Sequence, residues 1–194
     1  TYALSPAWVD YLGHWVVANL THRVIVHCSY ARSALVERYG RRRGVHTVPH
    51  PHYVGIYPNE ISAREARAQL GLTVDHRVFV FLGGIRPNKG LETLCTAFRS
   101  LPSENARLII AGKPWPPPEY VVQLEQLAAE DERIKLVLQF VPDSEIQIYL
   151  KSADVVVLPF ASILTSGSAI LAMSFGRPLV VPAIGCLPEL VSPQ

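Results

Sequence analysis

The feature that most constrains the fold is a regular alternation between short β-branched apolar runs and longer amphipathic segments, which continues from residue 7 to residue 182. Such alternation is typical of βαβ units, in which helices connect parallel strands. Several runs are continuous in Val, Ile and Leu, as expected of strands buried on both faces. The sequence therefore predicts an α/β fold, a Rossmann-like parallel sheet with helices on both faces.

The predicted strands are residues 23–26, 45–48, 78–82, 107–110, 134–138, 154–158 and 178–181. The predicted helices are residues 8–20, 30–39, 63–70, 91–100, 120–130, 144–151 and 168–175.

Three helix ends carry explicit signals. Ser62 and Glu65 have the spacing of a capping box, in which each side chain accepts a hydrogen bond from the backbone of the other residue. Gly71 and Gly176 follow predicted helices, where a left-handed glycine commonly ends the helix.

A stretch with two prolines and a glycine, residues 50–59, interrupts the alternation and is typical of an ordered linker. Residues 1–48 hold too few elements for a complete doubly wound domain, whereas five strands follow residue 76. We therefore expect residues 1–48 to be the end of one α/β domain. A linker and connecting helix would occupy residues 49–75, and a second Rossmann-like domain residues 76–194. The chain ends at Gln194 without a clear closing helix, so the last helix of the second domain is expected to be missing.

Composition excludes several classes of protein. Hydrophobic residues make up 49% of the 194 residues and charged residues 18%, which excludes a disordered chain. A net charge of +2 is too small to indicate nucleic acid as a partner. The three cysteines, Cys28, Cys95 and Cys186, are odd in number and far apart, so neither a disulfide nor a zinc site is expected. With no apolar run long enough for a membrane span and no secretory signal, a protein of the reducing cytoplasm is expected.

Ligands of open parallel sheets bind beyond the carboxyl ends of the strands, and one loop at such an end is rich in glycine. Residues 83–90, GGIRPNKG, follow a predicted strand and precede a helix. Gly83 and Gly84 allow close approach of the backbone, while Arg86 and Lys89 supply positive charge, so the loop suits a phosphate. It matches neither a Walker loop nor a dinucleotide fingerprint. The alternative is an exposed turn with ordinary surface cations.

A second loop runs into the predicted helix at residues 168–175. Thr165, Ser166 and Ser168 supply hydroxyls, Gly167 removes side-chain bulk, and the helix N-terminus attracts an anion. The alternative is an ordinary helix cap. Because both loops belong to the same edge of one sheet, we expect them to converge on a diphosphate.

Three other features carry weaker signals. The arginines at residues 41–43 are expected to be a solvated run, with contact to anionic lipid or a lipid-linked acceptor as the alternative. His50 and His52 lack a third ligand, so no metal site is expected. Trp115 stands among prolines in a loop expected to be rigid, although this loop also follows a strand at the ligand edge.

Several segments, in order along the chain, match one known family. The second region resembles the donor-binding domain of retaining GT-B glycosyltransferases of family 4, the glycosyl transferases group 1 type. Residues 1–48 resemble the last helix, strand and helix of that family's acceptor domain. The segments that carry the resemblance are FLGGIRPNKGLE at 81–92, LIIAG at 108–112, VPDSE at 141–145, YLKSADVVVLP at 149–159, AMSFGRPLV at 172–180 and GCLPE at 185–189.

The chain departs from the family pattern at positions that matter for ligand binding. The family's paired glutamates, one beside the donor sugar and one on the ribose, fall on Ile163 and Leu171, so those contacts cannot be transferred. The family's loop arginine falls on Gly84, and Arg86 stands two residues further on. Lys89 matches directly.

The resemblance implies transfer of a sugar from a UDP- or GDP-linked donor to a glycan or lipid-linked acceptor, with retention and with no cofactor or metal. It implies bacterial-type polysaccharide or glycoconjugate synthesis in the cytoplasm, with peripheral membrane contact. The acceptor would bind to the missing domain, so the isolated chain would bind nucleotide with little or no turnover. The expected diphosphate-binding residues are Gly83, Gly84, Arg86, Lys89, Thr165, Ser166, Gly167 and Ser168. The expected nucleoside-binding residues are Gly112, Gln139, Phe140 and Val141. No catalytic residue can be named from sequence.

Three other functions fit the same architecture. A GT-B sugar-nucleotide epimerase would act on the donor itself and would be separated by product analysis. A non-catalytic nucleotide-sugar-binding module is favoured by the loss of both glutamates. A dinucleotide-binding dehydrogenase domain is disfavoured, because no G-x-G-x-x-G follows the early strands.

Overall fold

The computed structural model describes residues 7–191, and the contacts of the chain divide it into two compact units. The first unit contains the chain up to Pro51, the short stretch Ser162–Ser166, and the chain from Ala183 onward. The second unit contains His52–Ala161 and Gly167–Pro182. From the sequence we expected a single division at residue 48. The structure instead groups two short stretches of the later region, Ser162–Ser166 and the chain from Ala183 onward, with the beginning of the chain.

The second unit is built on a five-stranded sheet whose order is β5-β4-β3-β6-β7. Every neighbouring pair is parallel, and Val80 at the centre pairs with both Ile109 and Val156. Residues of β3 and β4 such as Val78, Leu108 and Ile110 are fully buried, as the continuous apolar runs predicted. The strands are β3 (Arg77–Leu82), β4 (Ala106–Ala111), β5 (Ile134–Val137), β6 (Val155–Val157) and β7 (Leu179–Val180).

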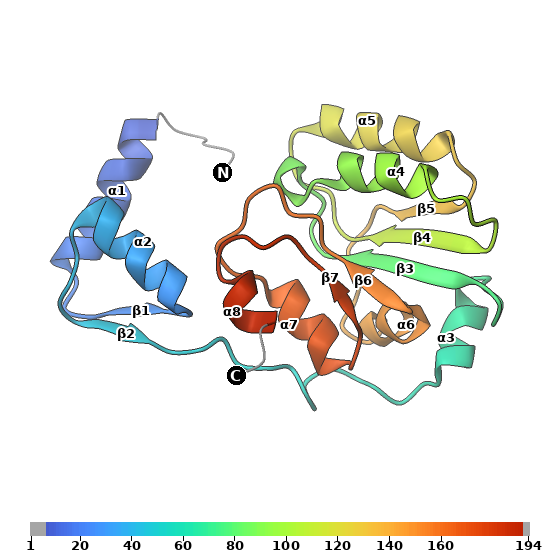
Figure 1. Cartoon of the computed structure of the whole chain (residues 1–194), viewed down its shortest axis with the longest axis horizontal. Coiled ribbons are helices and arrows are strands. Elements are labelled where there is room, and N and C mark those ends of the chain that lie inside the picture. Colours follow the sequence, from blue (N-terminus) through green and yellow to red (C-terminus); the bar gives the residue numbers. More distant parts are fainter. Residues whose placement is uncertain (1–6, 192–194) are drawn as a thin grey trace. The chain divides into compact units, whose positions relative to one another are not determined.

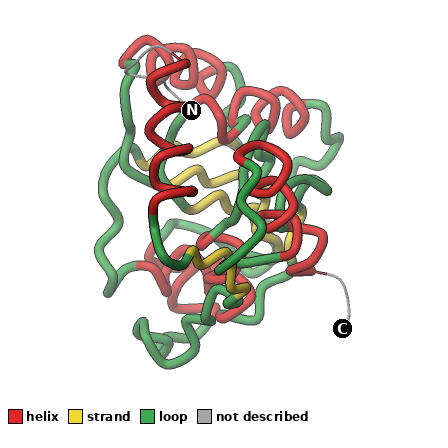
Figure 2. Tube along the Cα trace, turned by 90° about the vertical axis from the view of Figure 1, so that its left-hand side faces the viewer, coloured by secondary structure: helices red, strands yellow, loops and turns green. Residues whose placement is uncertain are grey.

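Helices cover both faces of this sheet, which confirms the predicted fold class. In Figure 1, α4 and α5 lie on one side of the strands and α3 and α6 on the other. Figure 2, a quarter turn away, shows the strands again between helical segments. Residues 91, 94, 95 and 98 of α4 recur at helical spacing and are all buried, which is why this segment forms a helix against the sheet. The helices are α3 (Ala63–Gln69), α4 (Leu91–Arg99), α5 (Pro118–Ala129), α6 (Ile146–Ser152) and α7 (Gly167–Ser174), with a single 3-10 turn, η1 (Pro87–Lys89).

The predicted helix-end signals are present. Ser62 accepts a hydrogen bond from the Glu65 N–H, and the Glu65 carboxylate accepts one from the Ser62 N–H, so the capping box at α3 is complete. Gly71 and Gly176 both have left-handed φ angles, 74° and 66°, and each follows the end of its helix, α3 or α7, after one intervening residue.

The first unit contains a parallel pair of strands and three helices within the described residues. Its elements are α1 (Ala7–Leu20), β1 (Val24–Val26), α2 (Ser29–Tyr39), β2 (Val45–Thr47) and α8 (Leu187–Val191). The short helix α8 was not expected from the sequence. Arg41, predicted to be part of a solvated run, donates hydrogen bonds to the carbonyl oxygens of Thr21 and His22 just after α1. Across residues 7–191, no helix has the length and apolar character needed to cross a bilayer.

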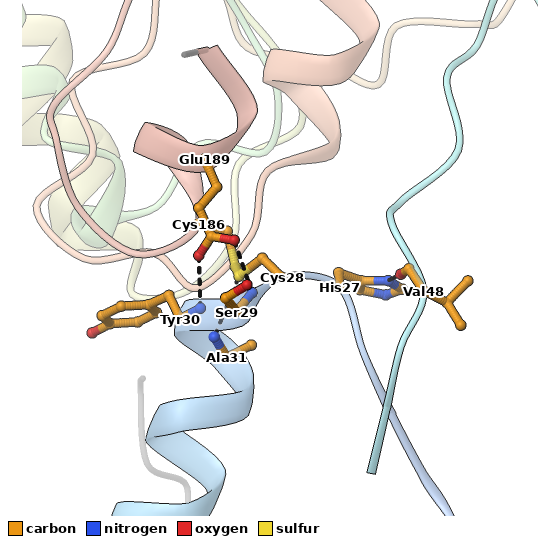
Figure 3. Close-up of a disulfide and its surroundings, with 8 residues drawn as sticks. All are labelled: His27, Cys28, Ser29, Tyr30, Ala31, Val48, Cys186 and Glu189. Carbon is orange, nitrogen blue, oxygen red and sulfur yellow. Dashed lines mark hydrogen bonds between the residues drawn. A yellow bond between two sulfur atoms is a disulfide. The ribbon is translucent and has the colours of Figure 1, made fainter. Parts of the chain in front are cut away.

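A disulfide joins Cys28 to Cys186, and the expectation that the chain contains no disulfide was wrong. The two residues are 158 positions apart in sequence, yet their Cα atoms lie 5.9 Å apart. Beside the disulfide, the Glu189 carboxylate accepts hydrogen bonds from the N–H groups of Ser29 (2.8 Å) and Tyr30 (2.7 Å), at the start of α2 (Figure 3). Folding thus brings the two cysteines together although their spacing carries no sign of it. The third cysteine, Cys95, is a buried thiol in α4, and burial raises its pKa to about 11.

Candidate functional site

The site lies in the second unit, where the loops after β3 and β4 are hydrogen-bonded to each other. The Gly83 N–H donates to the Ala111 carbonyl oxygen (3.0 Å). Further out, the Ile85 N–H donates to the Lys113 carbonyl, and the Trp115 N–H donates to the Ile85 carbonyl, both at 3.0 Å. The parallel pairing of β3 and β4 therefore continues beyond the strands, which fixes the two loops side by side.

Glycine is required where these loops approach most closely. A Cβ atom at Gly112 would overlap the Gly83 carbonyl group. A Cβ atom at Gly83 would lie 2.9 Å from the hydroxyl oxygen of Ser168, in α7. The absence of side chains at these two positions therefore brings β3, β4 and the start of α7 together at one edge of the sheet.

A pocket of about 360 Å³ opens at this edge. Arg86 and Lys113 are the charged residues among its described lining, and none of that lining is acidic. Its walls are otherwise apolar or aromatic, apart from the Ser168 hydroxyl. The lining residues are Leu82, Gly83, Gly84, Arg86, Gly112, Lys113, Trp115, Phe140, Val141, Ile146, Ser168 and Leu171.

Most of the site residues expected from the sequence lie in this pocket. Those of the predicted diphosphate set that line it are Gly83, Gly84, Arg86 and Ser168, and those of the predicted nucleoside set are Gly112, Phe140 and Val141. Gly167 begins α7 without lining the pocket, and Gln139 precedes Phe140 without lining it. Thr165 and Ser166 belong to the first unit.

Lys89 does not line the pocket, although it is in the same loop as Arg86. Its ammonium nitrogen lies 4.4 Å from the ring centre of the buried Phe160. Burial, and secondly the positive charge of Arg86, lower the pKa of Lys89. The loop is anchored here by Gly90, whose φ of 67° suits glycine and whose missing Cβ leaves room for the Pro159 carbonyl.

Sequence reasoning did not assign five of the lining residues, which are Leu82, Lys113, Trp115, Ile146 and Leu171. The Arg86 guanidinium carbon lies 4.2 Å from the ring centre of Trp115, and the Lys113 ammonium lies 5.9 Å from it. One feature of the sequence did indicate that Trp115 could belong to the site, because its loop follows a strand at the ligand edge of the sheet. Its prolines favoured a purely structural interpretation instead.

This arrangement can bind an anion that is attached to an apolar, flat group. Two cationic side chains and a helix N-terminus provide positive potential, while Phe140, Ile146 and Leu171 provide apolar surface. A helix that starts at the pocket offers backbone N–H groups in the geometry that phosphates prefer.

Comparison with known proteins gives consistent results. The sequence model for glycosyl transferases group 1 matches residues 76–194. A GDP-mannose:glycolipid 4-beta-D-mannosyltransferase of Xanthomonas campestris pv. campestris is 32% identical over 136 residues, which is 70% of this chain and 36% of that protein. The chain therefore spans little more than a third of the length of this curated relative.

Two solved structures share the fold. Sucrose-phosphate synthase from Thermosynechococcus elongatus aligns with the whole of this chain. The alignment covers 48% of the synthase chain, with a TM-score of 0.85 and 23% identity. Anabaena Alr3699/HepE, solved in complex with UDP and glucose, aligns with 98% of this chain. The alignment covers 53% of the HepE chain, with a TM-score of 0.83 and 24% identity.

Proposed function

The chain belongs to the glycosyl transferases group 1 family, and on that premise we propose that it binds the nucleotide-sugar donor of a glycosyltransferase. The observation that carries this proposal is the pocket beyond β3 and β4, which combines Arg86, Lys113 and the start of α7 with apolar walls. A nucleoside diphosphate sugar has the matching properties, a doubly anionic diphosphate joined to a flat base.

In the proposed reaction, the bond between the anomeric carbon of the sugar and the diphosphate breaks, and the diphosphate leaves with the electron pair. An acceptor hydroxyl oxygen bonds to the anomeric carbon, and its proton is taken up by a phosphate oxygen of the leaving diphosphate. Negative charge therefore grows on the leaving diphosphate, where Arg86, Lys113 and the N–H groups at the start of α7 stabilise it. Phe140 and Val141 contact the nucleoside, and Lys89 approaches the distal phosphate once the donor is bound.

We further propose that the enzyme is of family 4, transfers the sugar with retention and needs no metal, as the sequence resemblance implies. The base is uracil or guanine: the Xanthomonas relative is named for GDP-mannose, and the Anabaena structure holds UDP. We place the acceptor, a glycan or lipid-linked sugar, on residues outside this chain, so that the chain alone has little or no transferase activity. We also propose a cytoplasmic location with peripheral membrane contact.

A specific observation favours a second candidate, a nucleotide-sugar-binding module without transferase activity. Leu171 lines the pocket at a position where the resemblance places a ribose-binding glutamate, and Ile163 replaces the other glutamate. Incubation of the whole polypeptide with labelled donors and acceptors distinguishes the two, because only a transferase moves label to the acceptor. An epimerase would instead convert the donor sugar in the absence of acceptor.

The proposal is tested by calorimetric titration of the chain with UDP, GDP, uridine and guanosine, with and without a chelator. We expect one diphosphate to bind, unaffected by the chelator, and its affinity to exceed that of its nucleoside. Lys113→Ala should weaken diphosphate binding by about tenfold, the usual effect of losing a charged hydrogen bond. Lys151→Ala, on α6 outside the pocket, is the matched control and should leave affinity unchanged. Folded protein that binds neither diphosphate would contradict donor binding.

A further inference from the structure

Trp115 is the largest side chain of the pocket lining, and it contacts groups on the loop after β3. Nearly half of its surface, 46%, is exposed, so it is not a core residue that merely fills space. A Cβ atom at Gly84 would lie 3.1 Å from the indole nitrogen, which means that the ring occupies the space beside this glycine. On the same ring lies the guanidinium of Arg86, 4.2 Å from the centre.

The backbone holds the two residues in register. The Trp115 N–H donates to the carbonyl of Ile85, the residue directly before Arg86. Ile85 itself is fully buried, so this connection is anchored in the core. These bonds hold the backbones of the two loops in register, which brings the Trp115 ring and the Arg86 guanidinium close together.

The contrast with Arg133 shows what distinguishes Arg86. Arg133 also lies over an aromatic ring, that of Phe98 at 5.1 Å, but its guanidinium is ion-paired with Asp131 at 2.7 Å. Among residues 7–191, Arg86 has no such carboxylate partner. An aromatic ring restricts a guanidinium without neutralising it, which leaves the N–H groups of Arg86 free to bind an anion.

We propose that Trp115 is a positioning residue that holds the guanidinium of Arg86 at the pocket for the diphosphate of the donor. The inference deepens the proposed function and rests on it. Trp115 acts through Arg86, because the ring removes conformational freedom that the flexible arginine would otherwise lose on binding. Gly84 contributes to the same arrangement, because a Cβ atom at this position would lie 3.1 Å from the indole nitrogen and would displace the ring slightly.

The test is a double-mutant cycle on the whole chain, with the Kd of UDP, GDP and the two nucleosides measured by calorimetry. Trp115→Ala should weaken diphosphate binding about fivefold, the size expected for an exposed cation–π contact, and should leave nucleoside binding unchanged. Trp115→Phe keeps an aromatic face and should restore most of the affinity. Because Trp115 acts through Arg86, the double variant Trp115→Ala/Arg86→Ala should bind no more weakly than Arg86→Ala alone.

Gly84→Ala gives an independent measurement. The added methyl group meets the indole and should weaken diphosphate binding in the wild-type background but not in the Trp115→Ala background. Additive effects of Trp115→Ala and Arg86→Ala, or equal losses for UDP and uridine, would overturn the positioning role while leaving donor binding intact. Failure of the wild-type chain to bind either diphosphate would instead overturn the proposed function and this inference together.

Discussion

At the scale of single residues, the two cations of the glycine-rich loop are held by aromatic rings in different ways. Arg86 is exposed and lies over a ring at the pocket, whereas Lys89 is half-buried and lies over the ring of Phe160. Burial and the charge of Arg86 lower the pKa of Lys89. Lys89 therefore loses its proton at a lower pH than an ordinary lysine does.

This difference predicts a pH dependence of donor binding. Only protonated Lys89 attracts a diphosphate, so affinity for UDP or GDP should fall as the pH rises from neutrality towards 10.5, the ordinary lysine value. Lys89→Met should weaken binding by about tenfold at neutral pH and remove the early part of this fall. Titration calorimetry across the pH range measures both effects. Wild-type affinity in Lys89→Met would show that the ammonium serves only the contact with Phe160.

The glycine-rich loop shows how much of the candidate site could be predicted from single residues of the sequence. Glycines after a buried strand predicted a ligand loop, and Gly83, Gly84 and Arg86 do line the pocket. Trp115 was missed because a tryptophan among prolines has the same sequence pattern whether it is a structural or a ligand-site residue. Its position is decided by hydrogen bonds between two loops that are distant in sequence.

At the scale of elements, helix α2 receives a cap from a distant part of the chain. The Glu189 carboxylate accepts hydrogen bonds from the N–H groups of Ser29 and Tyr30, and these bonds lower its pKa. Cys28 occupies the N-cap position itself, and its sulfur accepts only one N–H, that of Ala31. Since Cys28 is in a disulfide and sulfur is a weak acceptor, the carboxylate provides most of the capping.

Removing this cap should destabilise the first unit. Glu189→Ala should lower the free energy of unfolding by about 1 kcal/mol, the usual effect of losing a helix cap. Because the folded pKa of Glu189 lies below the ordinary value of 4.5, the stabilisation is present above that pH and is lost as the pH falls through the folded pKa. Chemical denaturation of wild type and variant at several pH values measures this. A difference that stays constant into acid would contradict a role for the charge.

Elements with strong periodicity were predictable. The strands and helices of the second unit differ from expectation by a few residues at their ends, and the capping box at α3 was found from two residues. Helix α8 was not predictable because it has five residues, one of them Pro188, too few for a period to emerge. Its position depends instead on the Cys28–Cys186 disulfide and on Glu189.

At the scale of the whole molecule, the disulfide is expected to contribute strongly to stability. It closes a loop between residues 158 positions apart, and long loops gain most from closure in the chain-entropy description. Reduction should lower the free energy of unfolding by about 2–4 kcal/mol. Denaturation with and without a reductant measures this, and the double variant Cys28→Ser/Cys186→Ser is the control that should not respond. An equal response in that variant would exclude the disulfide as the cause.

The disulfide is also relevant to the cellular compartment in which the protein is found. Structural disulfides persist mainly in oxidising compartments, whereas the cysteine pattern and the family resemblance predicted the reducing cytoplasm. Counting the thiols of freshly prepared protein distinguishes the two states, because only Cys95 is free when the bond is closed. Pairing could not be predicted, since an odd number of distant cysteines is equally consistent with three thiols.

The bond between Cys28 and Cys186 also gives the chain a topology that its linear sequence lacks. All residues between these positions, including the entire second unit with its pocket, form a covalently closed ring. A single backbone cut anywhere in that ring opens it but releases no fragment until the disulfide is reduced.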